Sequence, residues 1–271
     1  MNNNGFIKEK LLLYLAVIML AFFIAAAAFA PRLSGYSPYN QNLQERFSQP
    51  SRIHILGTDE FGRDVFSRII YAGRVSLSVA AVAVVISVVI GTVLGLFAGY
   101  FGGWTDSLIV KLIDIFLCMP TFFLILMVVA FWGPSIRNIM IVIGVTSWPG
   151  LARLVRAEVL SVSKRDYILA VRALGYGKLR IIFVHILPNV LAPVFVAAVL
   201  GLGGAILVES GISFLGLGVQ PPFASWGDML SSGRTYMGTA WWLSFWPGFA
   251  IFLNVLSFNL VGEHLKENLS R

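Results

Sequence analysis

The sequence predicts an all-α membrane protein with six transmembrane helices. Of its 271 residues, 58% are hydrophobic and only 12% are charged, and the mean hydropathy is +0.82. A soluble domain usually carries about 25% charged residues, so this apolar excess fits a chain whose solvent is lipid. A helix needs about 20 apolar residues to cross the hydrocarbon. Six stretches approach that length: Leu11–Phe29, Val75–Phe101, Leu108–Phe131, Ile136–Leu154, Val190–Val208 and Trp241–Val261.

The first stretch lies within residues 1–30 and follows Lys8 and Lys10. Its end, Ala25–Ala28, is similar to the small-residue cleavage site of a signal peptide. The apolar run is long for a signal peptide and further spans follow, so we expect an uncleaved membrane anchor.

Residues 31–74 are expected to form an external loop that carries a short amphipathic helix. Pro31–Leu56 is polar and proline-containing, which indicates an irregular segment. Thr58 is predicted to cap a helix, with Asp59 and Glu60 in its first turn, where acidic side chains suit the helix dipole. Apolar side chains then recur on one face at helical spacing, so this helix is expected at the membrane surface or against the bundle: Phe61, Val65, Phe66, Ile69 and Ile70.

The remaining core is expected to span residues 75–265, followed by a short tail, 266–271. Gly91, Gly95 and Gly99 recur every four residues, which favours close packing against another helix of this chain or of a partner. Trp241, Trp242 and Trp246 are interpreted as an interfacial aromatic belt at the start of the sixth span.

A segment of about residues 162–188 interrupts the core with two predicted short helices. Tyr167–Leu174 has helical composition and stops at Gly175-Tyr-Gly177, a typical helix end. The second helix, Lys178–Ile186, is expected to end at Leu187-Pro188, because proline lacks the backbone N–H that a helix uses. Two short helices joined at a glycine turn would form a compact knob outside the membrane.

The densest basic cluster lies between the fourth and fifth spans, which places this knob in the cytoplasm. Counting crossings then puts both termini in the cytoplasm, although the external loop 31–74 also holds six arginines. The net charge of +7 is therefore interpreted as an orientation signal and not as a nucleic-acid surface. The cluster comprises Arg153, Arg156, Lys164, Arg165, Arg172, Lys178 and Arg180.

Catalytic and cofactor motifs are not found, so we expect no enzyme activity in this chain. Gly175-Tyr-Gly-Lys178 lacks the spacing of a phosphate-binding loop, and there is no nucleophile elbow or His-Glu-x-x-His motif. The single cysteine, Cys118, permits no intrachain disulfide. His54, His185 and His264 are far apart in sequence, so no metal site is expected.

Three segments resemble the permease subunits of ATP-driven (ABC) importers for dipeptides, oligopeptides and nickel. The resemblance extends from about Leu56 over nearly all of the remaining chain and implies the type I importer permease fold. It also implies a coupling segment that transmits ATP-driven closure from an ATPase subunit to the membrane helices. The three segments are His54–Arg68, Asp166–Asn189, and Glu209–Pro222 continued through Ser225–Leu230 to Asn259.

The family's coupling motif reads Glu-Ala-Ala, three residues, Gly, nine residues, Ile, one residue, Leu-Pro. This chain departs from it at Leu169, Val171 and His185, which puts any specific ion pair of the usual glutamate in doubt. The small residues in the segment would let a partner surface approach closely. The residues that the resemblance assigns to coupling are Leu169, Ala170, Arg172, Ala173, Gly175, Leu187 and Pro188.

Candidates for the translocation path are Asp114, Pro120, Glu209 and Ser210. Pro120 interrupts the third span and is expected to kink it, either at a moving pathway or as a packing feature. Glu209 is expected to form a wall or gate of the path, or to reach water at the headgroup level. Lys111 and Asp114 lie three residues apart and are expected to form an ion pair on one helix face.

The resemblance implies a partner set and a cell-membrane location. The partners would be a second, similar permease, two ATPase subunits that hold ATP and Mg²⁺, and an extracytoplasmic solute-binding protein. A peptide is the expected cargo, with nickel or a metal chelate as the alternative. A secondary transporter driven by an ion gradient would need midplane ionisable groups and often an inverted repeat, and an embedded enzyme would need clustered polar residues; neither pattern is found.

Overall fold

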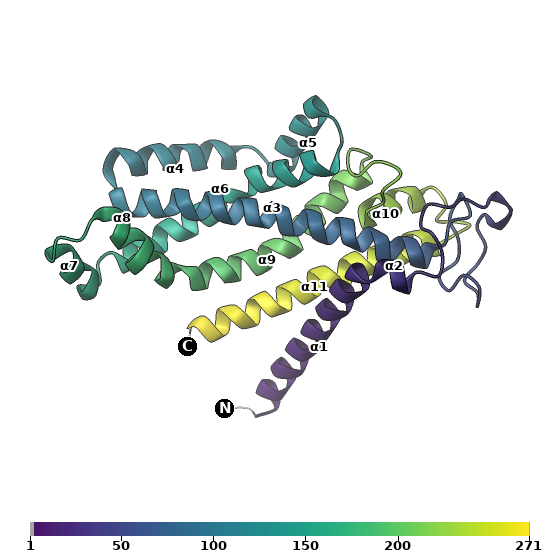
Figure 1. Cartoon of the computed structure of the whole chain (residues 1–271), viewed down its shortest axis with the longest axis horizontal. Coiled ribbons are helices and arrows are strands. Elements are labelled where there is room, and N and C mark those ends of the chain that lie inside the picture. The colour runs from purple at the N-terminus through teal and green to yellow at the C-terminus, as the bar shows by residue number, and fades with distance from the viewer. Residues whose placement is uncertain (1–2, 271) are drawn as a thin grey trace.

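Each of the six predicted apolar stretches falls in helical structure in the computed structural model (Figure 1). The structure describes residues 3–270 and the side chains of residues 10–269, so Lys8 lies outside the described side chains. The helices are α1 (Asn3–Ala28), α2 (Ala30–Leu33), η1 (Leu43–Glu45), α3 (Val65–Phe101), α4 (Gly103–Cys118), α5 (Thr121–Trp132), α6 (Ile136–Val162), α7 (Asp166–Ala173), α8 (Lys178–Arg180), η2 (Ile181–Ile186), α9 (Leu187–Phe214), α10 (Trp226–Arg234) and α11 (Trp242–Ser270).

Five helical segments among the described residues are long and apolar enough to cross a membrane. They are α1, α3, α6, α11 and the continuous helix from Lys178 to Phe214. The pair α4 and α5 passes the same test together but is bent by 84° at the intervening break. The predicted kink at Pro120 is therefore confirmed, and the pair covers the third predicted stretch, Leu108–Phe131, as a broken span or a re-entrant loop.

The predicted separate helix capped by Thr58 is wrong. Asp64 caps α3 instead, because its carboxylate accepts the Ser67 N–H at 2.8 Å. Residues 58–64 form a tight turn. The Asp59 carboxylate accepts hydrogen bonds from the N–H groups of Phe61 and Arg63, and Gly62 between them has a positive φ. Val65, Phe66, Ile69 and Ile70 consequently lie in the first turns of the 37-residue helix α3, and Phe61 lies in the turn before it.

The predicted end of a helix at Leu187-Pro188 is also wrong. Helix α8 continues through the π-helical segment η2 into α9 without a break. The Leu187 N–H reaches back to the carbonyl of Ile182, five residues earlier, which widens the turn just before Pro188. A widened turn followed by proline in the first turn of α9 accommodates the missing N–H, so the chain remains helical.

Helices α3 and α6 pack closely along the glycine face that the sequence predicted. A Cβ on Gly95 would lie 2.6 Å from the Val155 Cβ and 2.7 Å from the Ala152 carbonyl oxygen. Gly91 faces α6 in the same way one turn earlier, as does Gly99 one turn later. The predicted packing role is confirmed, and the partner helix belongs to this chain.

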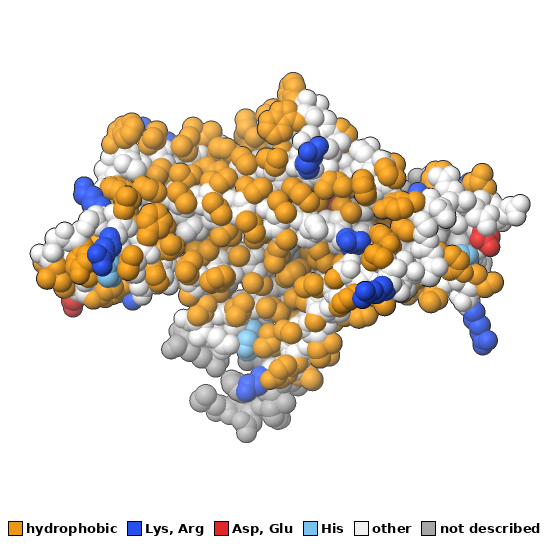
Figure 2. All heavy atoms as spheres, in the orientation of Figure 1, with side chains coloured by type: hydrophobic (Ala, Val, Ile, Leu, Met, Phe, Trp, Pro, Cys, Tyr) orange, Lys and Arg blue, Asp and Glu red, His pale blue; other side chains and the backbone are white. Residues whose placement is uncertain are grey.

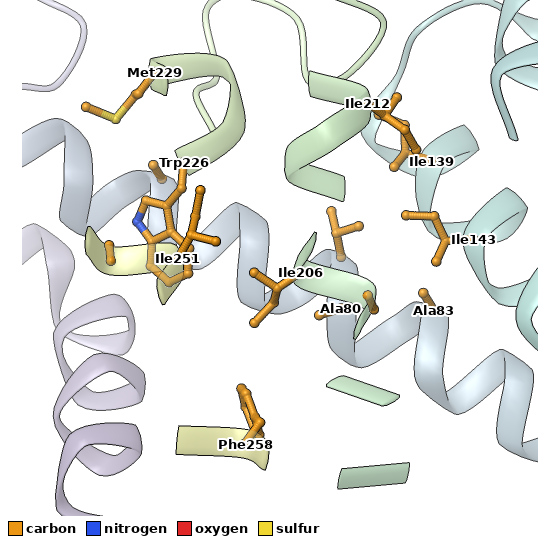
Figure 3. Close-up of a cluster of buried hydrophobic side chains, with 14 of the residues drawn as sticks. Ala80, Ala83, Ile139, Ile143, Ile206, Ile212, Trp226, Met229, Ile251 and Phe258 are labelled. Atoms are coloured by element: carbon orange, nitrogen blue, oxygen red, sulfur yellow. The ribbon is translucent and has the colours of Figure 1, made fainter. Parts of the chain in front are cut away.

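The main buried core joins α3, α6, α9, α10 and α11 (Figure 3). In that view Ala83 of α3 lies next to Ile143 of α6, and Ile139 of α6 lies next to Ile212 of α9. A second buried cluster lies where α6, α7 and η2 meet.

The outer faces of the helices are mainly apolar. Figure 2 shows hydrophobic side chains over most of the visible face between the two ends of the long axis. Exposed aromatic side chains include Phe22 on α1 and Phe123 and Phe131 on α5. Apolar surface of this extent fits contact with lipid or with other membrane subunits.

The start of α11 differs from the predicted aromatic belt. Trp242 is 2% exposed, and its indole N–H donates to the Thr58 carbonyl at 3.1 Å, so it joins the loop that precedes α3 to α11. Trp241 is 52% exposed and Trp246 is half-buried. At the other end, α11 extends to Ser270, so the predicted tail 266–271 is helical as far as the structure describes it.

Gly95→Val is expected to destabilise the α3–α6 contact, because the new side chain would overlap Val155 and the backbone of Ala152. Overpacking of this kind costs about 1–3 kcal/mol. Thermal unfolding of the purified protein in detergent measures the effect. Gly204→Val on α9, where a Cβ meets no atom within 4 Å, is the matched control. Equal melting temperatures for the two variants would contradict the packing argument.

Candidate functional site

The predicted knob, called the elbow from here on, consists of α7, the glycine turn and α8, residues 166–180, at the end of α6. A single buried side chain anchors it. Ile168 is 0% exposed and packs in the cluster that contains Val159 and Val162 of α6 and Ile181 and Ile182 of η2. The rest of α7 is mostly exposed. A displacement of α7 would therefore act directly on α6 and on the start of the following helix.

Helix α7 ends at Gly175, as the sequence predicted. The Leu174 N–H donates to the Ala170 carbonyl and the Gly175 N–H donates to the Arg172 carbonyl, which closes α7. Gly175 has a φ of +76°, and other residues pay about 1–2 kcal/mol for this left-handed backbone. A Cβ there would meet no atom within 4 Å. Conformation, not space, therefore requires glycine at this position.

The predicted coupling residues divide into two groups. Leu169, Ala170 and Ala173 are exposed on α7, next to the glycine turn. Arg172 is exposed as well, and its guanidinium lies 5.0 Å from the Tyr100 ring centroid at the end of α3. Leu187 and Pro188 are not in the elbow but in the first turn of α9.

The elbow presents an unusual combination of exposed apolar and basic side chains. Leu174 is 74% exposed and Leu179 is 59% exposed. Lys164, Arg165 and Lys178 are exposed around them. Exposed apolar side chains surrounded by charged ones are typical of protein–protein contact sites. The α7–α8 region lies at one extreme of the long axis in Figure 1, away from the middle of the spanning helices.

A cavity of about 610 Å³ lies between α3, α6, α9 and the α4–α5 break. Its walls are mainly apolar, many of the lining side chains are small, and none of the lining residues is charged. Pro149, inside α6, contributes to the wall. The polar lining residues are Ser87, Thr121, Thr146 and Ser147.

The predicted path residues are not all at this cavity. Pro120 adjoins it, because Thr121 and Leu117 on either side of the break are lining residues. Asp114 does not line the cavity, and its carboxylate forms an ion pair with Arg153 at 2.9 Å. The predicted ion pair between Asp114 and Lys111 is therefore wrong.

Glu209 and Ser210 are buried away from the cavity lining. The Glu209 carboxyl group is 0% exposed and accepts hydrogen bonds from Ser213 at 2.7 Å and from Ser76 at 3.1 Å. Ser76 in turn accepts the Trp226 backbone N–H at 3.2 Å. The predicted access of Glu209 to water at the headgroup level is wrong in this structure. The carboxyl group instead joins α3, α9 and α10.

One polar contact near the elbow had no signal in the sequence. Arg156 on α6 makes a two-point ion pair with Asp106 on α4, with nitrogen–oxygen distances of 2.5 and 2.6 Å. The partners are 50 residues apart. A single sequence shows no periodicity that would join them.

Comparison with known proteins identifies this architecture. Residues 91–271, about two thirds of the chain, match the model of the binding-protein-dependent transport system inner membrane component family. The chain belongs to this family. The resemblance inferred from the three sequence segments is thereby confirmed, as is the all-α membrane permease fold.

Relatives extend the family match over the N-terminal part of the chain. The dipeptide transport system permease protein DppC of Alkalihalophilus pseudofirmus is 44% identical over 97% of this chain and 86% of its own length. The protein of the same name from Escherichia coli K12 is 45% identical over 94% of this chain and 86% of its length. The di/tripeptide transport system permease protein DppC of Pseudomonas aeruginosa is 41% identical over 93% and 86%. The chain is thus a multi-pass membrane protein of a transport permease family.

The opposite end of this permease carries a network of charges. Asp59 bonds to Arg63 at 2.6 Å and lies 3.4 Å from Arg68. Burial raises the pKa of Asp228 on α10 to about 6, although Arg68 and Arg63 act to lower it. Burial also raises the pKa of Glu60, with the charge of Asp59 adding to the effect.

Asp228→Asn is expected to flatten the pH dependence of stability. The folded-state pKa of Asp228 is raised from 3.8 to about 6, so its protonated form favours the fold. This contribution is present below pH 3.8 and is lost as the pH rises through about 6, a change of up to about 3 kcal/mol. Melting temperatures between pH 4 and pH 7 should fall more steeply in the wild type. Parallel curves for both proteins would contradict the assigned shift.

Proposed function

We propose that the chain is one of two pore-forming permease subunits of an ATP-driven importer of di- and oligopeptides. The single observation that carries the proposal is the elbow. It is an exposed helix, closed by a left-handed glycine and anchored through Ile168 to a membrane-spanning helix, in a chain of the binding-protein-dependent family. The peptide permeases named above support the choice of peptide over nickel as cargo.

The elbow is proposed to receive a separate ATPase subunit, which holds ATP and Mg²⁺. Its exposed leucines offer an apolar contact, and the surrounding lysines and arginines fit an acidic rim on the partner. Leu169 stands where the family motif has glutamate, so this contact would be apolar at that point. ATP drives the cycle because the ATPase binds it with different affinity in two states, and the elbow carries that difference to α6.

The cavity is proposed as this chain's half of the translocation path, completed by a second, similar permease. Serine and threonine hydroxyls at its wall can exchange hydrogen bonds with any peptide backbone. An uncharged wall holds no peptide terminus tightly, which favours release after entry. Pro120 retains a proposed role at the moving wall. Asp114, Glu209 and Ser210 are proposed to hold helices in place around the path.

The elbow is proposed to face the cytoplasm. Its lysines and arginines support this orientation under the positive-inside rule. Six crossings then place both termini on the same side, and Figure 1 shows both ends of the chain away from the external loop. The loop formed by residues 34–64, together with α10, would face an extracytoplasmic solute-binding protein.

Gly175→Val is expected to uncouple ATP hydrolysis from peptide uptake in the assembled transporter. Valine would strain the left-handed turn and shift the elbow without a clash. Uptake of a labelled dipeptide into proteoliposomes should fall strongly while ATPase activity persists. Gly177→Val is the matched control, because Gly177 has a φ of −63° in the same turn and equally open surroundings. Equal uptake by both variants would count against the coupling role.

A reporter fused after Arg180 is expected to read cytoplasmic, because the basic elbow is retained inside. An alkaline phosphatase fusion at this point reports an external position, and a green fluorescent protein fusion reports a cytoplasmic one. A fusion after Gln49, in the loop at the opposite end, is the control and should read external. Phosphatase activity after Arg180 would overturn the orientation.

A further inference from the structure

Helix α4 is tied to α6 by two ion pairs near the elbow. Arg156 reaches Asp106 in the first turn of α4 with both Nε and Nη2. Arg153, three residues earlier on α6, reaches Asp114 at 2.9 Å. The Asp106 pair is the more enclosed, with side-chain exposures of 30% for Arg156 and 21% for Asp106, against 58% and 55% in the other pair.

Arg156 is connected to the elbow through α6 and its packing against α7. Arg156 lies within two turns of the end of α6 at Val162. Val159 and Val162 share their buried cluster with Ile168 of α7. A force on α7 therefore reaches the backbone that carries Arg156 through a continuous helix and a packed side chain.

Helix α4 carries Asp106 in its first turn and reaches the cavity with its last turn. Helix α4 runs from Gly103 to Cys118, and Leu117 in its last turn lines the cavity wall. The 84° bend follows directly, and Thr121 on its far side is also a lining residue. A shift of α4 along its axis would therefore displace the wall of the cavity at the break.

The apolar contact between α4 and α6 does not by itself fix their relative position along the axis. Ile109 and Ile113 of α4 pack against Ala152 and Trp148 of α6 and Ala98 of α3. Phe116 of α4 also meets Trp148 edge to face, with ring centroids 5.4 Å apart, so the apolar contact holds the two helices together without a directional hydrogen bond. A two-point arginine–carboxylate pair has a defined geometry and specifies one register.

We propose that Asp106 and Arg156 are positioning residues that transmit the movement of the elbow to the cavity wall. The inference rests on the proposed coupling function and deepens it by naming the route within this chain. The pair holds α4 to α6, so that α4, the break and the cavity wall follow the elbow as one unit. Loss of the pair would leave ATP hydrolysis and docking of the ATPase at the elbow intact. The cavity wall would no longer follow the movement of the elbow.

The chain provides its own reporter for this movement. Cys118 is its single cysteine, is exposed, and lies at the end of α4 next to the break. In a full complex whose partner subunits lack cysteines, maleimide labelling of Cys118 can be compared without nucleotide and with ATP held by a hydrolysis-deficient ATPase. The wild type should show a nucleotide-dependent labelling rate.

Asp106→Asn and Arg156→Gln are expected to assemble, to retain ATPase activity, and to lose dipeptide uptake by about fivefold or more, a typical lower bound for coupling between sites. They should also lose the nucleotide dependence of Cys118 labelling. The exchange variant Asp106→Arg with Arg156→Asp should recover part of both. Lys111→Gln is the control, since Lys111 is exposed on the same helix and forms no ion pair among the described residues.

Wild-type uptake and labelling by both single variants would overturn the inference. A parallel loss of ATPase activity and uptake that the exchange variant does not restore would assign the pair to folding alone and would also overturn it. A wild-type complex without ATP-driven dipeptide uptake would instead contradict the proposed function, so the two failures are distinguishable.

Discussion

The close approach of α3 and α6 is the contact on which the other features depend. Three glycines on α3 let its backbone meet the valines and leucine of α6 without intervening side chains. In lipid, where apolar side chains gain nothing by leaving the solvent, such close packing is a main source of helix association. The contact makes α3 and α6 a rigid pair. The cavity and the elbow are both built on that pair.

The two ends of the pair are fixed in different ways. At the elbow end, α6 leads directly into α7, and Ile168 packs back against the helix that it has just left. At the opposite end, the buried Glu209 carboxyl group joins α3 to α9, and through Ser76 to α10. The end with the elbow therefore presents an exposed helix, α7, that a partner can displace. An internal polar network around Glu209 fixes the other end. This asymmetry suits a transporter driven from one side of the membrane.

Local patterns in the sequence predicted the features that depend on a single helix. Apolar runs indicated the six spans, a four-residue glycine repeat indicated the α3 contact face, and Gly175 marked the end of α7. Features that depend on distant partners could not be predicted in this way. Glu209 meets Ser76 across 133 residues, and Arg156 meets Asp106 across 50. The helix end predicted at Pro188 was wrong, because the π-helical turn before it accommodates the missing N–H and the helix continues.

The central claim is that the elbow transmits work from a separate motor protein. Uptake of a labelled dipeptide should be measured in proteoliposomes that contain this chain and its partner permease, with and without the ATPase subunits and ATP. The account predicts uptake only when the ATPase subunits, ATP and the solute-binding protein are all present. Uptake by the permeases alone, or driven by an ion gradient, would contradict it.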